Sequence, residues 1–313
     1  MKIHAPGLRV LALLFAASLP LSLATATETA SPVRQSPVPL LWKVSDADNA
    51  LYLLGSFHLL RPDDYPLSED VDAAFADAES LLFELSPEEM NSPALPALML
   101  QAGMRGDGKQ LQDDLDPATW SALQDYAQKN SLPLANFASL EPWFAGLTIS
   151  ILELTKQGLD PTLGLDAHFM AAAAQAGKPA LGLETGKEQV AMLDGMATEE
   201  QKQFVAEALE EAAKGSQETA KLHAAWRSGD ADTLLDEMAA EMKRDYPRLY
   251  RRINVERNDR WTLELAGRLD GSDPGDVLVV VGALHLLGPD GVVEKLRAKG
   301  YKVERICSAC EAK

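Results

Sequence analysis

The chain has 313 residues, of which 46% are hydrophobic and 24% are charged, and its formal net charge is −18. This is the composition of a globular protein with enough apolar material for a sizeable core. The strong negative charge argues against nucleic acid and anionic lipid as partners, because both would repel the chain.

Residues 1–26 have the features of a signal peptide. A short basic start precedes the apolar stretch VLALLFAASLPLSLA, and ATA at 24–26 supplies the small residues that a signal peptidase reads. The apolar run is interrupted and is shorter than the ~20 residues of a spanning helix, so a retained membrane anchor is the less favoured alternative. We therefore expect an exported protein, periplasmic or secreted, with a flexible linker at 27–38 and no stable membrane insertion after cleavage.

The first elements of the mature chain are predicted to include both strands and helices. β-type runs at 39–44 and 50–56 flank the turn cluster SDADN and predict an antiparallel hairpin. A helix is expected to begin at Ser68, followed by a short buried strand at 80–85. Asp116, with a proline directly after it, marks the N-terminus of another helix. Two further helices and a buried strand are predicted at 139–158, 163–178 and 179–184.

A helical insert is predicted over about 198–270, where no strand signal occurs. Thr198 and Gln201 have the spacing of a capping box, and apolar residues recur at helical intervals after them. Because the segment is acidic, we expect it to face the solvent. His223, within it, is also expected to be exposed.

The C-terminal part returns to a β-type pattern. A β-branched buried strand is predicted at 276–282, a helix at 291–300 and an edge strand at 301–306. Strands at both ends of the chain with helices between them predict one α/β domain over 39–306. In this fold the N- and C-terminal strands form a central mixed sheet.

The only two cysteines of the sequence, Cys307 and Cys310, lie in the tail at 307–313. In an oxidising compartment a short-loop disulfide is the expected state. A metal site would need further ligands, and a thioredoxin-like redox site would open a helix after a strand. We therefore assign the pair no catalytic role.

One polar group ends each of four predicted buried strands. His58, Glu84, Glu184 and His285 all follow apolar runs. Ligands bind at the carboxyl ends of the strands in open α/β sheets. We therefore expect these four side chains to converge at one sheet edge if the strands run parallel.

The two histidines stand in a repeated motif, GSFHLL at 55–60 and GALHLL at 282–287. The glycine lets the chain turn at the strand end, and the Leu-Leu pair is expected to anchor the turn in the core. Histidine with Asp or Glu is ordinary ligand chemistry for Zn, Mn or Co, and a bound ion lowers the pKa of its water to about 7. We expect His58 and His285 to share a metal site with Glu84 as a ligand or a base. The alternative for each histidine is a satisfied place in the core.

Other residues are weaker candidates. Glu84 interrupts an apolar run and would otherwise be a salt-bridged strand end. Glu184 is a catalytic candidate that could instead cap the following helix. Asp166 and His168 lie two positions apart on different faces of a predicted helix, so one of them is expected to reach the metal site. Arg257, in NVERNDRW, would hold a substrate carboxylate or a developing oxyanion, or else lie on a solvated helix face.

Together these motifs resemble the TraB/PrgY/GumN family, to which the animal Tiki proteases belong. The resemblance rests on the paired G-x-x-H motifs, the Glu that closes a buried strand, LGLDAHF, LGLET with the following EQ, and ERNDRW, and it covers about 38–306. It implies an α/β fold and, through the Tiki members, metal-dependent peptide hydrolysis with Mn or Co. The site residues that it implies are His58, Glu84 and His285, with Asp166, His168, Glu184 and Arg257 as weaker additions.

The sequence therefore favours an exported metal-dependent hydrolase that cleaves a peptide bond in a peptide or protein substrate, with Mn, Co or Zn as the divalent ion. The alternative is a non-catalytic protein of the same fold that sequesters a peptide or another ligand, because some family members are described through inhibition of peptide pheromones. Hydrolysis of a non-peptide ester is a third hypothesis, which no sequence feature separates from the first.

Overall fold

The computed structural model describes residues 36–215, 217–271 and 275–311. The predicted signal peptide at 1–26 lies outside the described residues, as does most of the predicted linker at 27–38. Among the described helices, none is both long enough and apolar enough to cross a membrane.

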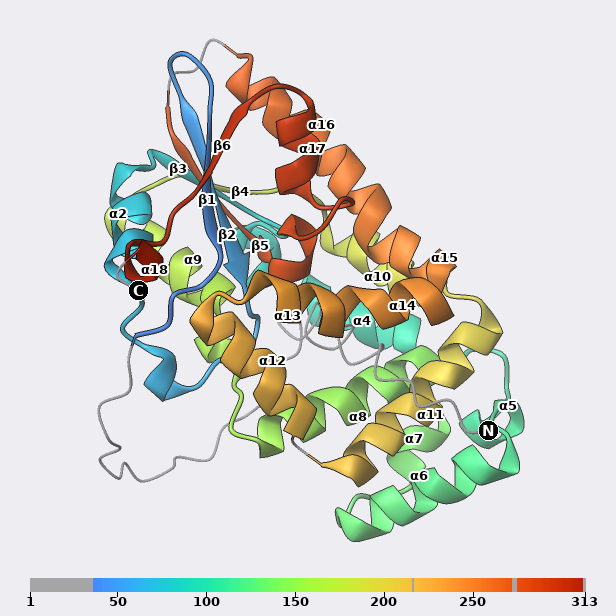
Figure 1. Ribbon diagram of the computed structural model, residues 1–313. Coiled ribbons are helices and arrows are strands. Elements are labelled where there is room, and N and C mark those ends of the chain that lie inside the picture. Colours follow the sequence, from blue (N-terminus) through green and yellow to red (C-terminus); the bar gives the residue numbers. More distant parts are fainter. Residues whose placement is uncertain (1–35, 216, 272–274, 312–313) are drawn as a thin grey trace.

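A six-stranded sheet organises the fold (Figure 1). Its spatial order is β4-β3-β5-β2-β1-β6. The pairs β2–β5, β5–β3 and β3–β4 are parallel, whereas β1 pairs antiparallel with both β2 and β6. The predicted α/β fold, with a central mixed sheet built from N- and C-terminal strands, is therefore confirmed. The strands are β1 Leu41–Ser45, β2 Ala50–Ser56, β3 Ser80–Phe83, β4 Ala180–Gly182, β5 Val277–Gly282 and β6 Lys302–Arg305.

The centre of the sheet is made of two apolar strands. Every residue of β2 and β5 is buried, and their register pairs Leu53 with Val279. Continuous apolar runs are typical of parallel strands, because helices cover both faces of such a sheet. The strand predicted at 179–184 is present as β4, but the prediction that it is buried is wrong, because β4 lies at the edge of the sheet and Leu181 is 50% exposed.

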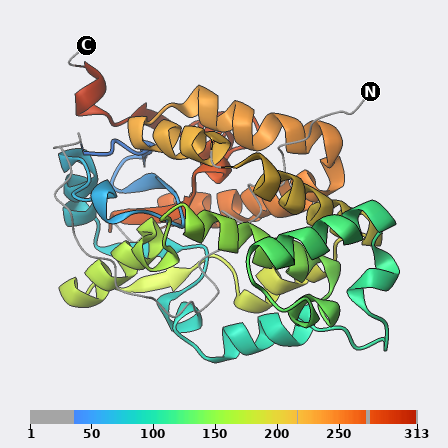
Figure 2. The ribbon, with the colours of Figure 1, turned by 90° about the horizontal axis from the view of Figure 1, so that it is seen from below.

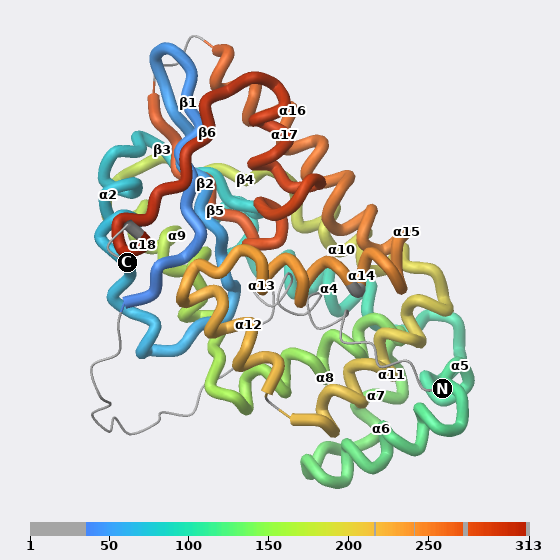
Figure 3. Tube along the Cα trace, viewed as in Figure 1, coloured from blue at the N-terminus to red at the C-terminus, as the bar shows by residue number. Residues whose placement is uncertain are grey.

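The two ends of the described chain meet in the antiparallel part of the sheet. The predicted hairpin is present as β1 and β2, and the predicted edge strand β6 runs beside β1 (Figure 3). Trp42 pairs with Arg305 across this contact, and the guanidinium carbon lies 4.7 Å from the centre of the indole ring. The predicted disulfide between Cys307 and Cys310 is present.

Helices of the first two-thirds of the chain follow local signals closely. Ser68 stands at the N-cap of α2, and Asp116 caps α6 by accepting hydrogen bonds from the backbone amides of residues 118 and 119. Gly177 ends α9 in the left-handed conformation, with φ +67°. These helices are α2 Glu69–Asp77, α3 Pro87–Met90, α4 Ala94–Gly103, α5 Leu111–Asp114, α6 Pro117–Lys129, α7 Ala135–Ala138, α8 Pro142–Lys156, α9 Leu165–Ala176 and α10 Gly186–Asp194, with the 3₁₀ turns η2 Pro62–Asp64 and η3 Pro161–Leu163.

The predicted insert is helical, and it both faces the solvent and packs against the first histidine motif. Trp226 and Trp261 are buried, and Nε1 of Trp226 donates a hydrogen bond to the carbonyl oxygen of Gly55 at 3.0 Å. Much of the insert, in orange, lies on one side of the strands, and the cyan to yellow-green helices lie mostly on the other (Figure 2). Its elements are α11 Thr198–Lys214, α12 Gln217–Ser228, α13 Ala231–Leu235, α14 Glu241–Asp245, α15 Pro247–Tyr250 and α16 Glu256–Leu269, with π-helical turns η4 Asp236–Ala240 and η5 Arg251–Val255.

The start of the insert also differs from the predicted capping box. Ala197 is the N-cap of α11, and the carboxylate of Glu200 accepts a hydrogen bond from the backbone amide of Ala197 at 2.9 Å. Thr198 is therefore the first helical residue, and Gln201 donates instead to the carbonyl oxygen of Met196. After β5 the chain forms η6 Ala283–Leu286, α17 Val292–Ala298, β6 and the short α18 Ser308–Glu311.

Candidate functional site

Two distant histidines meet at one carboxylate oxygen. Nε2 of His58 and Nε2 of His285 each lie 3.8 Å from Oε1 of Glu84. β2, β5 and β3 run parallel and side by side, so their carboxyl ends lie at the same edge of the sheet. The geometry brings the two motif histidines and Glu84 together, and all three side chains are buried.

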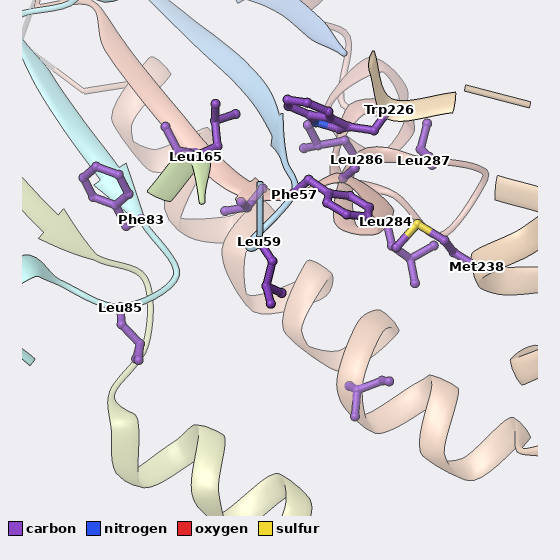
Figure 4. Packing of buried hydrophobic residues seen from close by; sticks show 14 of the residues in the cluster. Phe57, Leu59, Phe83, Leu85, Leu165, Trp226, Met238, Leu284, Leu286 and Leu287 are labelled. Carbon is purple, nitrogen blue, oxygen red and sulfur yellow. The ribbon is translucent and has the colours of Figure 1, made fainter. Parts of the chain in front are cut away.

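The repeated motif has a packing reason. Gly55 of the first motif lies so close to the second that an added Cβ would stand 3.2 Å from Cβ of Ala283. The residues flanking both histidines are buried in one core cluster with Trp226 of the insert (Figure 4). The two turns are therefore held rigidly against each other, and each presents its imidazole to the same point. The large buried hydrophobic residues of the motifs are Phe57, Leu59, Leu60, Leu284, Leu286 and Leu287.

The guanidinium of Arg257 is the centre of the cluster. Its Nη2 donates to both Glu84 and Glu184, and its Nε donates to Oε2 of Glu184 at 3.0 Å. Nη1 lies 2.9 Å from Nε2 of His285, and the guanidinium carbon lies 4.6 Å from the ring centre of Trp261. Burial opposes the charge of Arg257, but Glu84 and Glu184 outweigh it and raise the pKa of the guanidinium further. Arg257 is thus a permanent cation between two carboxylates. The alternative prediction, in which Arg257 lies on a solvated helix face, is wrong, because the residue is fully buried.

The protonation state of His285 follows from its partners. Since an arginine can only donate, Nε2 of His285 must accept, and its proton stands on Nδ1, which lies 2.7 Å from Oδ1 of Asn258. Burial, then the charges of Arg257 and His58, lower the pKa of His285 well below its ordinary value. His285 is therefore a neutral imidazole with a defined tautomer.

His58 has the opposite electrostatic environment. Its Nδ1 lies 2.6 Å from Oδ2 of Asp166, and that carboxylate also accepts a hydrogen bond from the hydroxyl of Ser56. Burial would lower the pKa of His58, but the Asp166 carboxylate, with Glu84, outweighs burial and raises it. Although the Asp166 carboxyl is buried, its contacts with His58 and Ser56 lower its pKa. Nε2 of His58 is buried and has no hydrogen-bond partner.

A glycine allows the approach of α9 that brings Asp166 to His58. A Cβ built on Gly164 would overlap the carbonyl oxygen of His58, and the amide of Leu165 donates to the carbonyl oxygen of Phe57 at 3.2 Å. The start of α9 therefore lies directly against the first motif. Of the two predicted candidates on this helix, Asp166 is the one that reaches the cluster.

The two glutamates of the cluster are fully engaged. Oε1 of Glu84 accepts from the amide of Gly282 at 2.9 Å, and the side-chain amide of Gln189 lies 2.9 Å from Oε1 of Glu184 and 3.3 Å from Oε2 of Glu84. Burial raises the pKa of Glu184, and Arg257 offsets only part of this effect. The expected alternative, in which Glu184 caps the next helix, does not hold, because Thr185 stands at that N-cap.

His168 is not brought to the cluster. Its ring lies 4.7 Å from the ring of Tyr65 and 4.9 Å from that of Phe169, and the residue is solvent-exposed. Because Asp166 points from the opposite face of α9 toward His58, its neighbour two positions away points outward. The geometry therefore gives no support to His168 as a metal ligand.

His223 is placed opposite to expectation. It is buried, and its Nε2 lies 2.8 Å from Oδ2 of Asp64, which is fully buried. Its ring lies 6.0 Å from that of Phe57 in the first motif. The prediction of an exposed residue is wrong because α12 packs against that motif, a tertiary contact that charge patterning along the insert does not indicate.

Sequence reasoning assigned no role to three partners of the cluster. Ser56 forms a hydrogen bond with Asp166, and Asn258 forms one with His285. Gln189 donates to both Glu184 and Glu84. All three stand in stretches that carry the family resemblance, Ser56 in the first G-x-x-H motif, Gln189 in the EQ pair and Asn258 in ERNDRW. Nothing in the sequence indicates their bonding partners, which only the folded structure shows.

A pocket of about 350 Å³ opens beside His58 and Asp166, which form part of its wall. The rest of the wall comes mainly from α3 and α9, with the first residue of η3. His285 and Arg257 are not among its lining residues. A ligand would therefore approach the cluster from the side of His58.

The types of donor in the cluster are those that bind divalent metal ions. Ligands that each lie about 2.1 Å from a tetrahedral ion are about 3.4 Å apart, close to the 3.8 Å that separates each Nε2 from Oε1 of Glu84. The orphaned Nε2 of His58, with a carboxylate at the other ring nitrogen, is typical of a metal-binding histidine. As they stand, no three such donors among the described residues are placed to chelate an ion. The contact of Arg257 with Nε2 of His285 is the feature that would have to change.

Comparison with known proteins identifies relatives over most of the chain. Residues 40–305 match the sequence model of the TraB/PrgY/gumN family. The proteins named "Uncharacterized protein YbaP" from Escherichia coli (strain K12) and from Shigella flexneri are each 23% identical over 256 residues, which is 79% of this chain and 87% of the relative. No solved structure matches the chain. The family match spans all six strands and both histidine motifs.

Proposed function

The chain belongs to the TraB/PrgY/gumN family, and from the convergence of its two motif histidines on Glu84 we propose that it is a metal-dependent hydrolase of peptide bonds. The single observation that supports this proposal is the placement of both Nε2 atoms 3.8 Å from one carboxylate oxygen beside an open pocket. Paired imidazoles and a carboxylate are the donors that hydrolytic Zn, Mn or Co sites use.

In this proposal His58, Glu84 and His285 hold the ion, which would be Mn, Co or Zn. When bound, such an ion polarises the carbonyl group of a substrate and lowers the pKa of water. The hydrogen bond between Asp166 and Nδ1 of His58 leaves the lone pair on Nε2 when the ring is neutral. The contact of Asn258 with Nδ1 of His285 selects the same tautomer on the other side of the cluster.

Arg257 and Glu184 would serve the reaction without holding the ion. The lone pair on Nε2 of His285 cannot accept from Arg257 and bind a cation at once, so Nη1 of Arg257 must leave it. The guanidinium would stay paired with Glu84 and Glu184 and steady the negative charge that develops on the substrate oxygen. Burial raises the pKa of Glu184, which brings this carboxylate closer to the range of a general base at neutral pH.

The direct test is hydrolysis by the mature chain. The purified protein would be incubated with a mixed peptide library and with Mn²⁺, Co²⁺ or Zn²⁺ in turn, and fragments would be identified by mass spectrometry. We expect cleavage that EDTA abolishes and that His58→Ala and His285→Ala each reduce at least a hundredfold. His168→Ala is the matched control, because this histidine lies outside the cluster and should leave cleavage unchanged. Unchanged cleavage in both motif variants would contradict the proposal.

A second candidate function is the capture of a peptide without chemistry. It is supported by the closed state of the cluster, in which Arg257 engages His285 and both glutamates and is itself fully buried. In the same library experiment, saturable binding without fragments under every metal would favour this function.

We also propose that the protein is exported, to the periplasm or beyond the cell. The signal-like features of residues 1–26 support this location, as does the Cys307–Cys310 disulfide, because such bonds persist in oxidising compartments. Expression of the full chain with fractionation and N-terminal sequencing would test it. The expected product begins near Thr27, and a cytoplasmic product that retains Met1 would refute export.

A further inference from the structure

The pocket beside His58 is small and close to the proposed reaction centre. At about 350 Å³ it lies near the lower end of the range for ligand pockets, roughly 300–1,000 Å³. Space of this size accommodates one bulky side chain with its adjacent backbone, and not a folded partner. Because His58 and Asp166 form part of the wall, a side chain seated here would place the neighbouring peptide bond beside His58.

One wall is a row of alanines on α9. Ala167, Ala171 and Ala174 line the pocket, and their spacing of four and three residues puts them on one face of the helix. Their short side chains leave space that a larger residue would fill. Met170, on the same helix, adds an apolar and flexible surface.

The rest of the lining is also mainly apolar. It comes from Pro87 and Met90 of α3 and Pro161 of η3, with Asn91 as an uncharged polar residue whose side-chain NH2 donates to the carbonyl oxygen of Pro87 at 2.8 Å. The ionisable groups that line the pocket, His58 and Asp166, are bonded to each other. A charged substrate side chain would therefore lose its water without gaining a partner of opposite charge, whereas an apolar one would gain free energy from burial.

We infer that this pocket selects a substrate peptide with a bulky apolar residue, such as Leu, Met or Phe, directly beside the bond to be cleaved. The inference rests on the proposed function for the position of that bond. The selection itself is a property of α3 and α9, and it can be measured as binding without any turnover.

Binding would be measured by competition against a fluorescent peptide, with EDTA present so that no metal-dependent cleavage occurs. The competitors would be blocked peptides that differ at one position, with Leu, Phe, Gly, Asp or Lys. We expect the Leu and Phe peptides to bind about 10- to 100-fold more tightly than the Gly, Asp and Lys peptides. Equal affinity for all five would overturn the inference.

Ala171→Phe fills the pocket, and Ala176→Phe makes the same change on the exposed end of the same helix, outside the pocket. We expect the first variant to lose the preference for Leu and Phe and the second to keep it. Thermal unfolding of both variants would show that the fold is retained, since both alanines are solvent-exposed. A preserved preference in Ala171→Phe would place the apolar side chain elsewhere and refute the inference.

The outcomes separate the two proposals. A preference that is lost in Ala171→Phe, without cleavage under any metal, would refute the hydrolase and support the pocket. Metal-dependent cleavage with no preference for an apolar residue, unaffected by Ala171→Phe, would support the hydrolase and refute the pocket.

Discussion

The carboxylate of Asp166 lies 2.6 Å from Nδ1 of His58, although 108 residues separate them in the sequence. Both side chains are buried, and the contact orients the other ring nitrogen toward Glu84. The pair therefore determines both the direction and the protonation of the first motif histidine. It also makes the electrostatic environment of His58 unlike that of His285. Nε2 of His285 contacts Arg257, whereas Nε2 of His58 has no hydrogen-bond partner.

Asp166→Asn should lower the pKa of His58. The carboxylate is the main group that raises this pKa against the effect of burial, so its loss leaves burial dominant. We expect the pKa to fall below about 6.5, the ordinary value for histidine. The ring protons of His58 followed by NMR against pH would measure it, with Asp160→Asn on the exposed turn before α9 as the control. A pKa that stays above the ordinary value in Asp166→Asn would contradict this account.

The same pair predicts how stability depends on pH. Because the folded state raises the pKa of His58, its protonated form contributes stability that is fully present below about pH 6.5 and is lost as pH rises through the raised pKa. In urea unfolding at pH 6 and pH 9, the difference in unfolding free energy between the wild type and Asp166→Asn should therefore be larger at pH 6. A difference that grows toward pH 9 would show that the sign is wrong.

His285 should contribute to the pH dependence of stability with the opposite sign to His58. Its folded pKa lies well below the ordinary value, so the unfolded chain takes up a proton that the folded chain does not. The stability from the neutral ring is present above about pH 6.5 and falls as pH is lowered, by at most about 1.4 kcal/mol per pH unit. His285→Gln should lose less stability than the wild type between pH 7 and pH 5 in urea unfolding. Parallel losses in the two proteins would argue that His285 is protonated in the fold.

Arg257→Met should be strongly destabilising. It leaves Glu84 and Glu184 buried without their cation, a change that typically costs about 3–5 kcal/mol. Arg260→Met is the matched control, because that side chain is 52% exposed and lies 3.6 Å from Oε2 of Glu184. Its loss should cost less than about 1 kcal/mol. Equal unfolding free energies for the two variants would mean that the buried network contributes little to the fold.

Gly164→Ala should disturb the site through the backbone. The added Cβ would overlap the carbonyl oxygen of His58 and force α9 away from the first motif, at a cost of about 1–3 kcal/mol. Gly267→Ala, on the exposed face of α16 with open space around it, should instead stabilise the protein by about 0.5–1 kcal/mol. Thermal unfolding of both variants measures the contrast. A neutral Gly164→Ala would show that α9 can shift without loss.

Metal binding should stabilise the protein, provided the proposed site is correct. A ligand at a hundredfold excess over its dissociation constant adds about 2.7 kcal/mol to the folded state. For a chain of this size we expect Mn²⁺ or Co²⁺ to raise the Tm by several degrees and EDTA to reverse the shift. His58→Ala should abolish the shift and His168→Ala should preserve it. A shift of equal size in all three proteins would locate the ion elsewhere.

Local signals were sufficient for much of the fold. The N-caps Ser68 and Asp116, the left-handed Gly177 and the apolar runs that became β2 and β5 all act within a few residues along the chain. The reason is that capping, helix termination and strand burial depend on neighbours in sequence. The predictions failed where a neighbour in space decided, as with the edge position of β4 and the burial of His223.

By itself, the sequence determined that His58, Glu84, Glu184 and His285 follow four strands, and it predicted one shared edge on the condition that these strands run parallel. The parallel pairing of β2, β5, β3 and β4 in the structure meets that condition. Only the tertiary structure decided the protonation of the two histidines. Asp166 reaches His58 because Gly164 permits close packing, and Arg257 reaches His285 because the insert covers the sheet. A side chain's pKa depends on burial and on charges within a few ångströms, and those distances exist only once remote segments are packed together.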